Sequence, residues 1–196
     1  MPADSAYIRE FKKFTQGQPT PDDLTRLEEE LYGSSDRASA VLLASFAEAA
    51  LETFLRSKVR PAYSADDMRR LFEFSGILGS FGAKITAAYA FNWFGPETRY
   101  DLDLIRLLRN EFAHSRKSFT FIDTPVAAVC TELRSPDWPG SFIPFGSLTR
   151  ATSEADADKL HPRTRYRSAC HTISYGLLTH AGGTLASASG QYVDLR

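Results

Sequence analysis

The sequence predicts an all-α protein folded as an antiparallel bundle of about seven helices. Apolar residues recur at spacings of three and four through most of the 196-residue chain, which is the period of a helix. Proline or a small hydroxyl residue precedes most of these stretches, and glycine or proline follows them. No alternating run of β-branched residues is long enough for a sheet, although residues 118–121 (SFTF) could form one short strand.

The first third of the chain predicts three helices. Residues 4–15 form a short amphipathic stretch whose apolar positions share one helical face: Tyr7, Ile8, Phe11 and Phe14. Thr20 is suited to cap a second helix with Pro21 at its first position, running to about residue 32 before Gly33. From Ser34 or Ser35 as the cap, the chain runs to residue 60 without glycine or proline and is apolar on nearly every face, so we expect a central helix surrounded by others.

The middle of the chain predicts four shorter segments. After Pro61, a link runs to about residue 68, followed by a short helix over 68–74. Ser80 can cap a helix that reaches about residue 91, before Gly95 and Pro96. A longer helix over 96–115 begins with that proline, and Thr124 with Pro125 opens another that runs to about residue 133.

The C-terminal third changes in composition. Residues 134–160 are rich in proline, glycine, serine and aromatic residues, which is typical of a long irregular loop. A last helix is expected over 162–182, and the remaining tail is weakly patterned. We therefore interpret residues 1–196 as a single domain, with a core over about 34–133 completed by the helix at 162–182.

The charge balance argues against a general nucleic-acid binder. Lysine and arginine (23) nearly balance aspartate and glutamate (24), so the formal charge is −1. The densest basic stretch, HPRTRYR at 161–167, is more typical of a solvated helix start than of a DNA contact. No compact helix-turn-helix with a basic recognition helix is apparent, so we expect no direct DNA binding.

Two further features bear on the cell compartment. Cys130 and Cys170 are too few for a disulfide framework or a zinc quartet, and both lie in apolar helical patterns, so we expect buried, reduced thiols. The N-terminal stretch lacks an apolar signal region, and charges interrupt the longest apolar runs. These observations predict a cytoplasmic protein that is not embedded in a membrane.

The strongest candidate site is RNEFAH, residues 109–114, near the end of the helix predicted over 96–115. At 100° per residue, its apolar side chains converge on one face: Leu104, Ile105, Leu108 and Phe112. Asn110 and His114 lie on the opposite face, with Arg106 on the flank of that face. Arg109 is about 140° from His114, at the edge of the apolar face.

Two interpretations of these residues remain open. In the first, His114 transfers a proton, Arg109 stabilises a phosphate and Asn110 orients either of them, which would suit RNA cleavage without a metal. In the second, His114 interacts favourably with the helix C-terminus, and Arg109 pairs with a buried carboxylate. Glu48 is the candidate carboxylate, because it stands in the apolar run SFAEAAL and would be costly there without a partner.

Other polar residues give weaker signals. Lys84 is the single charge in GAKITAAYAF, so it could extend to solvent, pair with a carboxylate or bind a ligand. Together with Glu48 and Arg106 it completes our set of candidate binding residues. The remaining histidines lack acidic or cysteine partners at metal-ligand spacing, so we predict no metal site and no cofactor: His161, His171 and His180.

Several stretches resemble the mannitol operon repressor-like family of bacterial regulators. They are LGSFGAKITAAYAF at 78–91, DLDLIRLLRNEFAHS at 101–115, FIDTP at 121–125 and DRASAVLLASFAEAALETFL at 36–55, with PRTRYRSAC at 162–170 more distantly similar. That family is related to the HEPN superfamily of helical domains, whose signature is an arginine, a polar residue and a histidine, as in Arg109, Asn110 and His114. The resemblance implies a homodimeric helical bundle and, for some HEPN members, metal-independent RNA cleavage at the dimer cleft.

The leading hypothesis is a homodimeric regulatory module that binds another protein in transcriptional regulation, without contacting DNA and without being an enzyme. The alternative is an endoribonuclease of the HEPN type that uses Arg109, Asn110 and His114. A third possibility is a degenerate relative that keeps the fold and the dimer but has lost the chemistry.

Overall fold

The computed structural model describes residue 10 and residues 17–59, 62–138 and 161–181. These residues form seven α-helices and one 3-10 helix: α2 (Pro21–Glu30), α3 (Asp36–Lys58), α4 (Ala65–Phe72), α5 (Phe81–Ala90), α6 (Pro96–His114), α7 (Thr124–Thr131), η1 (Ser135–Asp137) and α8 (Pro162–Ala181). The described residues contain no strand, which confirms the all-α prediction and shows that the strand suggested for 118–121 was wrong. Apart from Glu10, the helix predicted over 4–15 lies outside the described residues, as do most of the predicted loop and the tail after 181.

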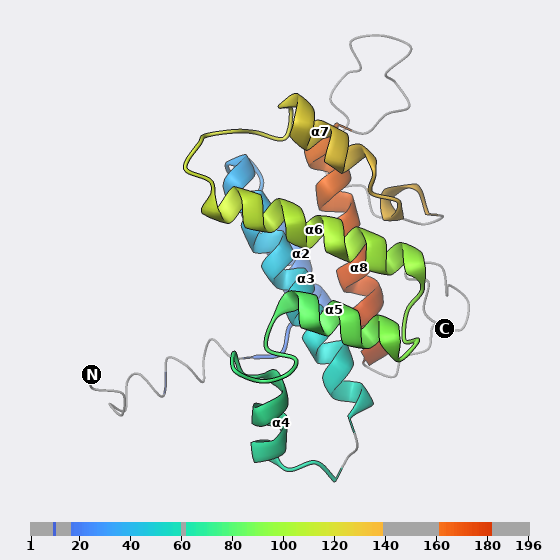
Figure 1. Cartoon of the computed structure of the whole chain (residues 1–196). Helices are drawn as coiled ribbons and strands as arrows, with labels where there is room; N and C mark the ends of the chain where they lie inside the picture. The colour runs from blue at the N-terminus through green and yellow to red at the C-terminus, as the bar shows by residue number, and fades with distance from the viewer. Residues whose placement is uncertain (1–9, 11–16, 60–61, 139–160, 182–196) are drawn as a thin grey trace.

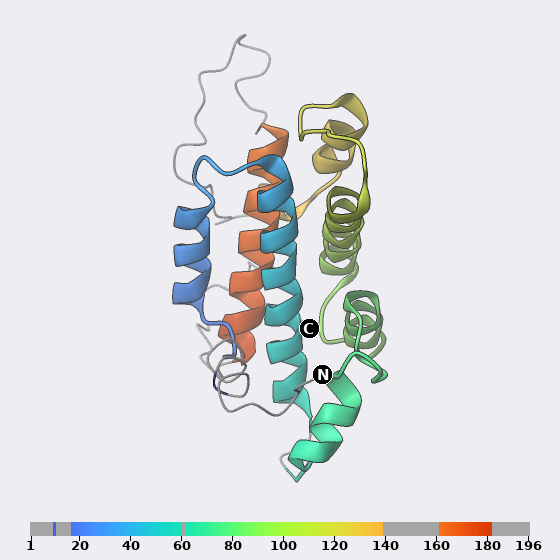
Figure 2. The same ribbon diagram turned by 90° about the vertical axis from the view of Figure 1, so that its left-hand side faces the viewer.

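The helices pack in two layers (Figures 1 and 2). One layer contains α2, α3 and α8, and the other contains α5, α6 and α7, with α4 beyond the end of both. Helix α3 packs on α8 in one layer and on α5 and α6 in the other, so it is the central helix that its apolar sequence predicts. Figure 1 shows α6 crossing α3 obliquely.

The two most closely associated helices, α3 and α8, run in the same direction. Arg163 at the start of α8 bonds Ser34 just before α3, while Leu178 near the end of α8 shares a cavity with Ser57 near the end of α3. Helix α2 is antiparallel to both, because Glu28 near its end contacts Arg167 in the first turns of α8. The antiparallel expectation therefore describes α2 and its neighbours but not α3 and α8, which are separated by five helices and so are not constrained by a short loop.

Side-chain caps set most helix starts. Thr20 forms the predicted cap of α2 in a reciprocal capping box with Asp23, and Ser35 and Ser80 cap α3 and α5 as expected. Ser64 also accepts a bond from the Asp67 N–H, which starts α4 at residue 65 rather than at the predicted 68. The sequence analysis missed this cap. Helix α7 is shorter than predicted, ending at residue 131 rather than at about 133.

An aromatic cluster joins the two layers. Phe112 of α6 packs on Phe119 and Phe121 of the following connection, with ring centroids 4.5 and 4.8 Å apart. Phe121 in turn packs on Tyr166 of α8 at 5.1 Å, and the Tyr166 hydroxyl donates to the Ala40 carbonyl at 2.8 Å. The stretch suggested as a strand therefore supplies two core side chains, Phe119 and Phe121.

The two cysteines lie in this core as predicted. Cys130 and Cys170 are buried, and burial raises the pKa of the Cys130 thiol to about 12 and that of Cys170 well above its usual range. Helix α3 is the one described helix that is long and apolar enough to cross a membrane, with a mean hydropathy of 1.5 over 18 residues. Half of that window is buried inside the bundle.

Candidate functional site

The RNEFAH stretch occupies the last turns of α6, and its side chains point in different directions. Ile105 and Phe112 are completely buried and Leu108 nearly so, whereas His114 is exposed at the end of the helix, as the helical period predicts. Among the described residues, no hydrogen bond or ion pair joins His114 to another side chain. The prediction that the imidazole faces outward is thus confirmed.

Arg109 is turned away from His114 and toward α3. Its guanidinium Nη2 lies 3.7 Å from the Glu48 carboxylate, and its Nη1 donates to the Asn110 amide oxygen at 3.0 Å. This is the pairing with Glu48 that the sequence suggested. Within one copy of the chain, Arg109 and His114 therefore do not converge on a common point where a phosphate could lie between them.

Glu48 belongs to a chain of alternating charges that links α3, α5 and α6. The Lys84 ammonium of α5 lies 2.9 Å from both the Glu48 and the Glu52 carboxylates of α3, although the lysine is only 5% exposed. Glu52 also accepts two hydrogen bonds from Arg56, at 2.7 and 2.9 Å. Because Glu48 also faces Arg109, this charge network contains three cations, Arg109, Lys84 and Arg56, and two carboxylates, Glu48 and Glu52.

The electrostatics of this charge network favour the ionised form of Glu52. Burial alone would raise the pKa of Glu52, but hydrogen bonds from Lys84 and Arg56 outweigh it and hold that pKa below its usual value. A lysine buried between two carboxylates satisfies its donors and ties α5 to α3. Lys84 therefore has the contacts of a structural ion pair, because both neighbouring carboxylates already engage its ammonium group.

Arg106 does not join this network. Its side chain lies across α5 at Gly82, where a Cβ atom would be 3.7 Å from the Arg106 Cδ and Nε atoms. The nearest carboxylate is Asp103, one turn earlier on α6, at 3.6 Å. The structure thus brings Glu48, Lys84 and Arg109 together, places Arg106 beside them, and leaves His114 apart.

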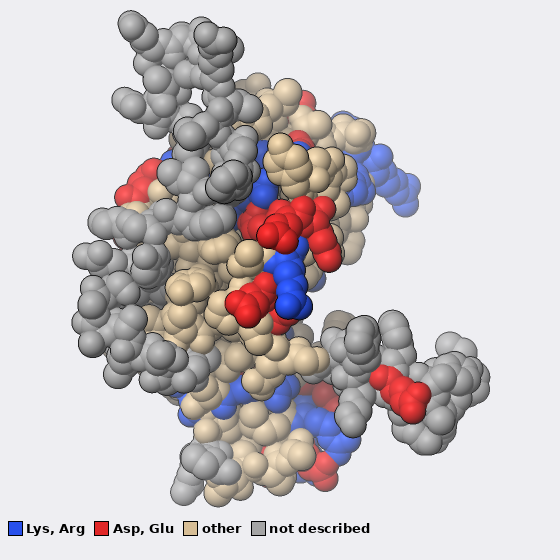
Figure 3. Space-filling view, turned by 180° about the vertical axis from the view of Figure 1, so that it is seen from behind, with Lys and Arg blue, Asp and Glu red and all other residues tan. Residues whose placement is uncertain are grey.

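The basic stretch at the start of α8 is paired rather than solvated, which corrects the sequence interpretation. Arg163 lies 3.1 Å from Asp36 and donates to the Ser34 carbonyl, while Arg165 bonds Asp137 at 2.9 Å. Arg167 donates to the buried Glu28 of α2 at 2.9 Å. On the face opposite to that of Figure 1, acidic and basic side chains are interspersed (Figure 3). The described arginines of α8 therefore hold helices together.

Two buried carboxylates were missed by the sequence analysis. Asp101 of α6 is fully buried and accepts backbone N–H bonds from Arg134 and Ser135 at 2.7 to 3.1 Å, which anchors η1. Burial raises the pKa of Asp101 and of Glu28, despite the hydrogen bonds that oppose the shift. The available signal was an acidic residue on the apolar face of each predicted helix.

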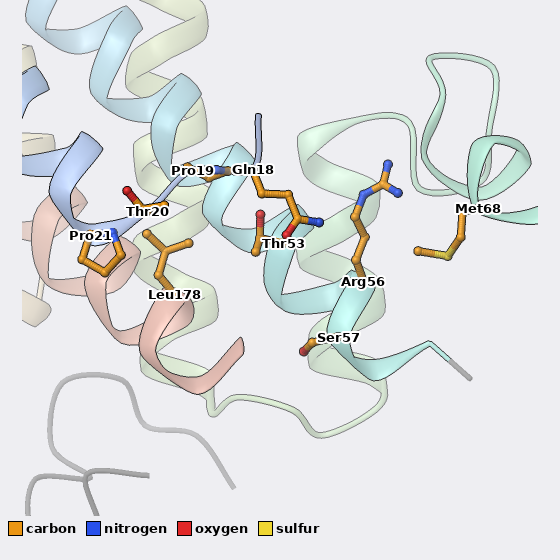
Figure 4. Close-up of a pocket in the computed structure, with 9 residues that line it drawn as sticks. All are labelled: Gln18, Pro19, Thr20, Pro21, Thr53, Arg56, Ser57, Met68 and Leu178. Atoms are coloured by element: carbon orange, nitrogen blue, oxygen red, sulfur yellow. The ribbon is translucent and has the colours of Figure 1, made fainter. Parts of the chain in front are cut away.

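A cavity of about 510 Å³ lies beside the last turns of α3 (Figure 4), whereas Ser115, next to His114, contacts Arg37 at the start of that helix. Its walls come from the start of α2 and the segment before it, from the last turns of α3 and α8, and from α4. The lining residues are Gln18, Pro19, Thr20, Pro21, Thr53, Arg56, Ser57, Met68 and Leu178. The lining offers hydroxyls, one amide and one guanidinium but no histidine, cysteine or carboxylate. The described lining thus mixes hydrogen-bonding and apolar groups and lacks the side chains that most often perform acid–base chemistry.

His171 gives the fold a testable pH dependence. Burial lowers the pKa of this α8 histidine to about 4, and the nearby Arg167 acts in the same direction. Between pH 6.5 and 4 the unfolded chain thus binds more protons than the native one. The free energy of unfolding should therefore decrease as the pH is lowered, by at most about 1.4 kcal/mol per pH unit. Urea unfolding at pH 7 and pH 5 measures this slope. The His171→Gln variant should flatten it, and an identical slope in the variant would contradict the assignment.

Comparison with known proteins gives one structural similarity. No protein-family model matches the chain, and a search of curated proteins finds no match. The fold is similar to that of a chain in the X-ray structure of the MtlR–HPr complex from Escherichia coli, with a TM-score of 0.52 and 17% sequence identity. The alignment covers 81% of this chain and 94% of that one. At this identity, the similarity shows a common fold.

Proposed function

We propose that this chain is a cytoplasmic regulatory module that works as a homodimer and binds another protein, with no direct contact to DNA. The observation that carries the proposal is the shared fold with a chain solved in complex with HPr. It agrees with the resemblance of residues 34–133 to the mannitol operon repressor-like family. Arg163, Arg165 and Arg167 each pair with a carboxylate of this chain. This further supports the proposal, because guanidinium groups that are already neutralised by carboxylates contribute little to binding a phosphate backbone.

Binding to purified Escherichia coli HPr tests the proposal. Isothermal titration calorimetry should show saturable binding of one HPr per chain, and the same protein should not shift duplex DNA in an electrophoretic assay at physiological salt. Absence of HPr binding at 100 μM of each protein, or salt-resistant binding to one DNA sequence, would contradict it.

A ribonuclease of the HEPN type is the second candidate, because His114 is exposed and free to meet a second copy. The separation of Arg109 from His114 within one chain argues against it. We expect no cleavage of labelled RNA in EDTA that depends on His114. The matched comparison is His114→Ala against His180→Ala, since His180 lies on α8 and bonds the Gly176 carbonyl. Cleavage lost only in the first variant would replace the binding module with the enzyme.

A further inference from the structure

The α4 arm, residues 62–80, extends beyond the end of both helical layers (Figures 1 and 2). It consists of α4 and the turn that leads to α5, and its inner side chains Met68, Leu71, Phe72 and Leu78 pack on the core. On the outer side, Phe74 is 99% exposed and Ile77 is 76% exposed. A fully exposed phenylalanine beside an exposed isoleucine is unusual for a surface that meets only water.

The turn that presents these two side chains is tightly built. The Gly76 N–H donates to the Glu73 carbonyl at 2.6 Å, and the Leu78 N–H reaches back to the Leu71 carbonyl at 2.8 Å. A Cβ atom at Gly76 would lie 2.5 Å from backbone oxygens of α4, and one at Gly79 would lie 2.3 Å from the Glu73 oxygen. Both positions therefore require glycine. The turn fixes the backbone at Phe74 and Ile77, so little backbone ordering is needed for a contact.

The exposed charges of the α4 arm are balanced. Four exposed charged residues lie in the same arm, two of each sign: Asp66, Arg69, Arg70 and Glu73, with Asp66 and Arg69 forming an ion pair. The remaining charge of the arm, Asp67, is half-buried and accepts a bond from the Ser64 hydroxyl at the helix start. A surface with equal numbers of acids and bases can match a copy of itself turned by 180°, which is what a two-fold interface requires.

We propose that the α4 arm is the contact surface between two copies of this chain, with Phe74 and Ile77 of each copy at its centre and the four charges around them. This inference rests on the homodimer in the proposed function and names its surface. Four apolar side chains would be buried per dimer, each contributing about tenfold or more to affinity, against the large entropic cost of association. We therefore expect a dissociation constant in the micromolar range.

The first test is sedimentation equilibrium of the full chain between about 1 and 100 μM. The double variant Phe74→Ser with Ile77→Ser should weaken self-association at least about 100-fold, because it removes the apolar centre. The matched control is Tyr32→Ser with Ile122→Ser, since those side chains are 73% and 67% exposed elsewhere on the surface. The control should associate like the parent chain, and both variants should keep the thermal unfolding temperature of the dilute protein.

The second test uses charge reversal. One variant carries Arg69→Glu with Arg70→Glu, and the other carries Asp66→Lys with Glu73→Lys. Each should be monomeric alone because like charges face each other across the two-fold axis, and an equimolar mixture should form a heterodimer. A monomeric parent chain at 100 μM, a dimer that survives loss of Phe74 and Ile77, or a mixture that stays monomeric would each overturn the proposal.

Binding of Escherichia coli HPr to the same variants separates this inference from the proposed function. The arm variants should bind HPr with the affinity of the parent chain, per chain. Loss of HPr binding in the Phe74 and Ile77 variant would instead assign the α4 arm to the protein partner and overturn its role between two copies.

Discussion

Replacing Phe112 with alanine should lower the free energy of unfolding by about 4 kcal/mol, the largest effect that we expect from one substitution. The Phe112 ring is fully buried and contacts both Phe119 and Phe121, which in turn contacts Tyr166 of the other layer. Alanine would leave a cavity where the two layers meet, and rigid neighbours would fill it only in part. Equilibrium unfolding in urea, followed by circular dichroism, measures the change.

The control for this prediction is Phe91→Ala. Phe91 is 66% exposed and touches one ring, Trp93, so its removal should lower the free energy of unfolding by less than about 1.5 kcal/mol. Equal losses for the two variants would mean that the aromatic cluster does not join the layers as described. The Phe112→Ala variant should also change the slope of the urea transition, which reports the surface exposed on unfolding.

Replacing Lys84 with alanine should lower the free energy of unfolding by about 3 kcal/mol. The ammonium is 2.9 Å from each of the two glutamates, and its loss leaves Glu48 and Glu52 close together with partly exposed arginines as their remaining partners. The destabilisation should be larger at pH 7 than at low pH, because Lys84 helps to hold the pKa of Glu52 below its usual value, and this stabilisation is lost as pH falls. Thermal and urea unfolding at several pH values measure both effects.

Lys84→Met supplies the comparison, because methionine fills the same space without a charge. It should cost less than alanine at low pH, where protonation of Glu52 lessens the need for a cation, and approach the alanine variant at pH 7. If Lys84 were a binding residue instead, both variants would fold like the parent chain and lose affinity for a partner. Unchanged stability in both would therefore contradict the structural role that the ion pairs indicate.

Local rules predicted the helices well because their signals lie within a few residues. Hydroxyl caps at Thr20, Ser35 and Ser80 each precede a helix at the predicted place. The start of α4 was missed because Ser64 follows a proline-containing link, which favoured a later start. The direction of α8 relative to α3 could not be predicted, because it depends on contacts between residues such as Tyr166 and Ala40, 126 positions apart.

The candidate site was predictable only in part. The position of Glu48 in an apolar run predicted a cationic partner, and Arg109 is one, at 3.7 Å. The closer partner, Lys84, comes from α5, and the sequence offered no register between α3 and α5. Arg167 was misread as solvated because its partner Glu28 lies 139 positions away. Periodicity indicates which face is buried, but not which distant charge meets it.

The parallel pairing of α3 and α8 has a consequence for synthesis of the chain. Helix α8 is the element that α3 contacts most, and it leaves the ribosome more than 100 residues after α3. Until then α3 keeps part of its apolar surface exposed. Proteins whose helices make contacts at such long sequence separation fold slowly and tend to aggregate. A nascent chain stalled before residue 162 should therefore recruit chaperones, whereas one stalled after residue 181, with α8 outside the exit tunnel, should release them.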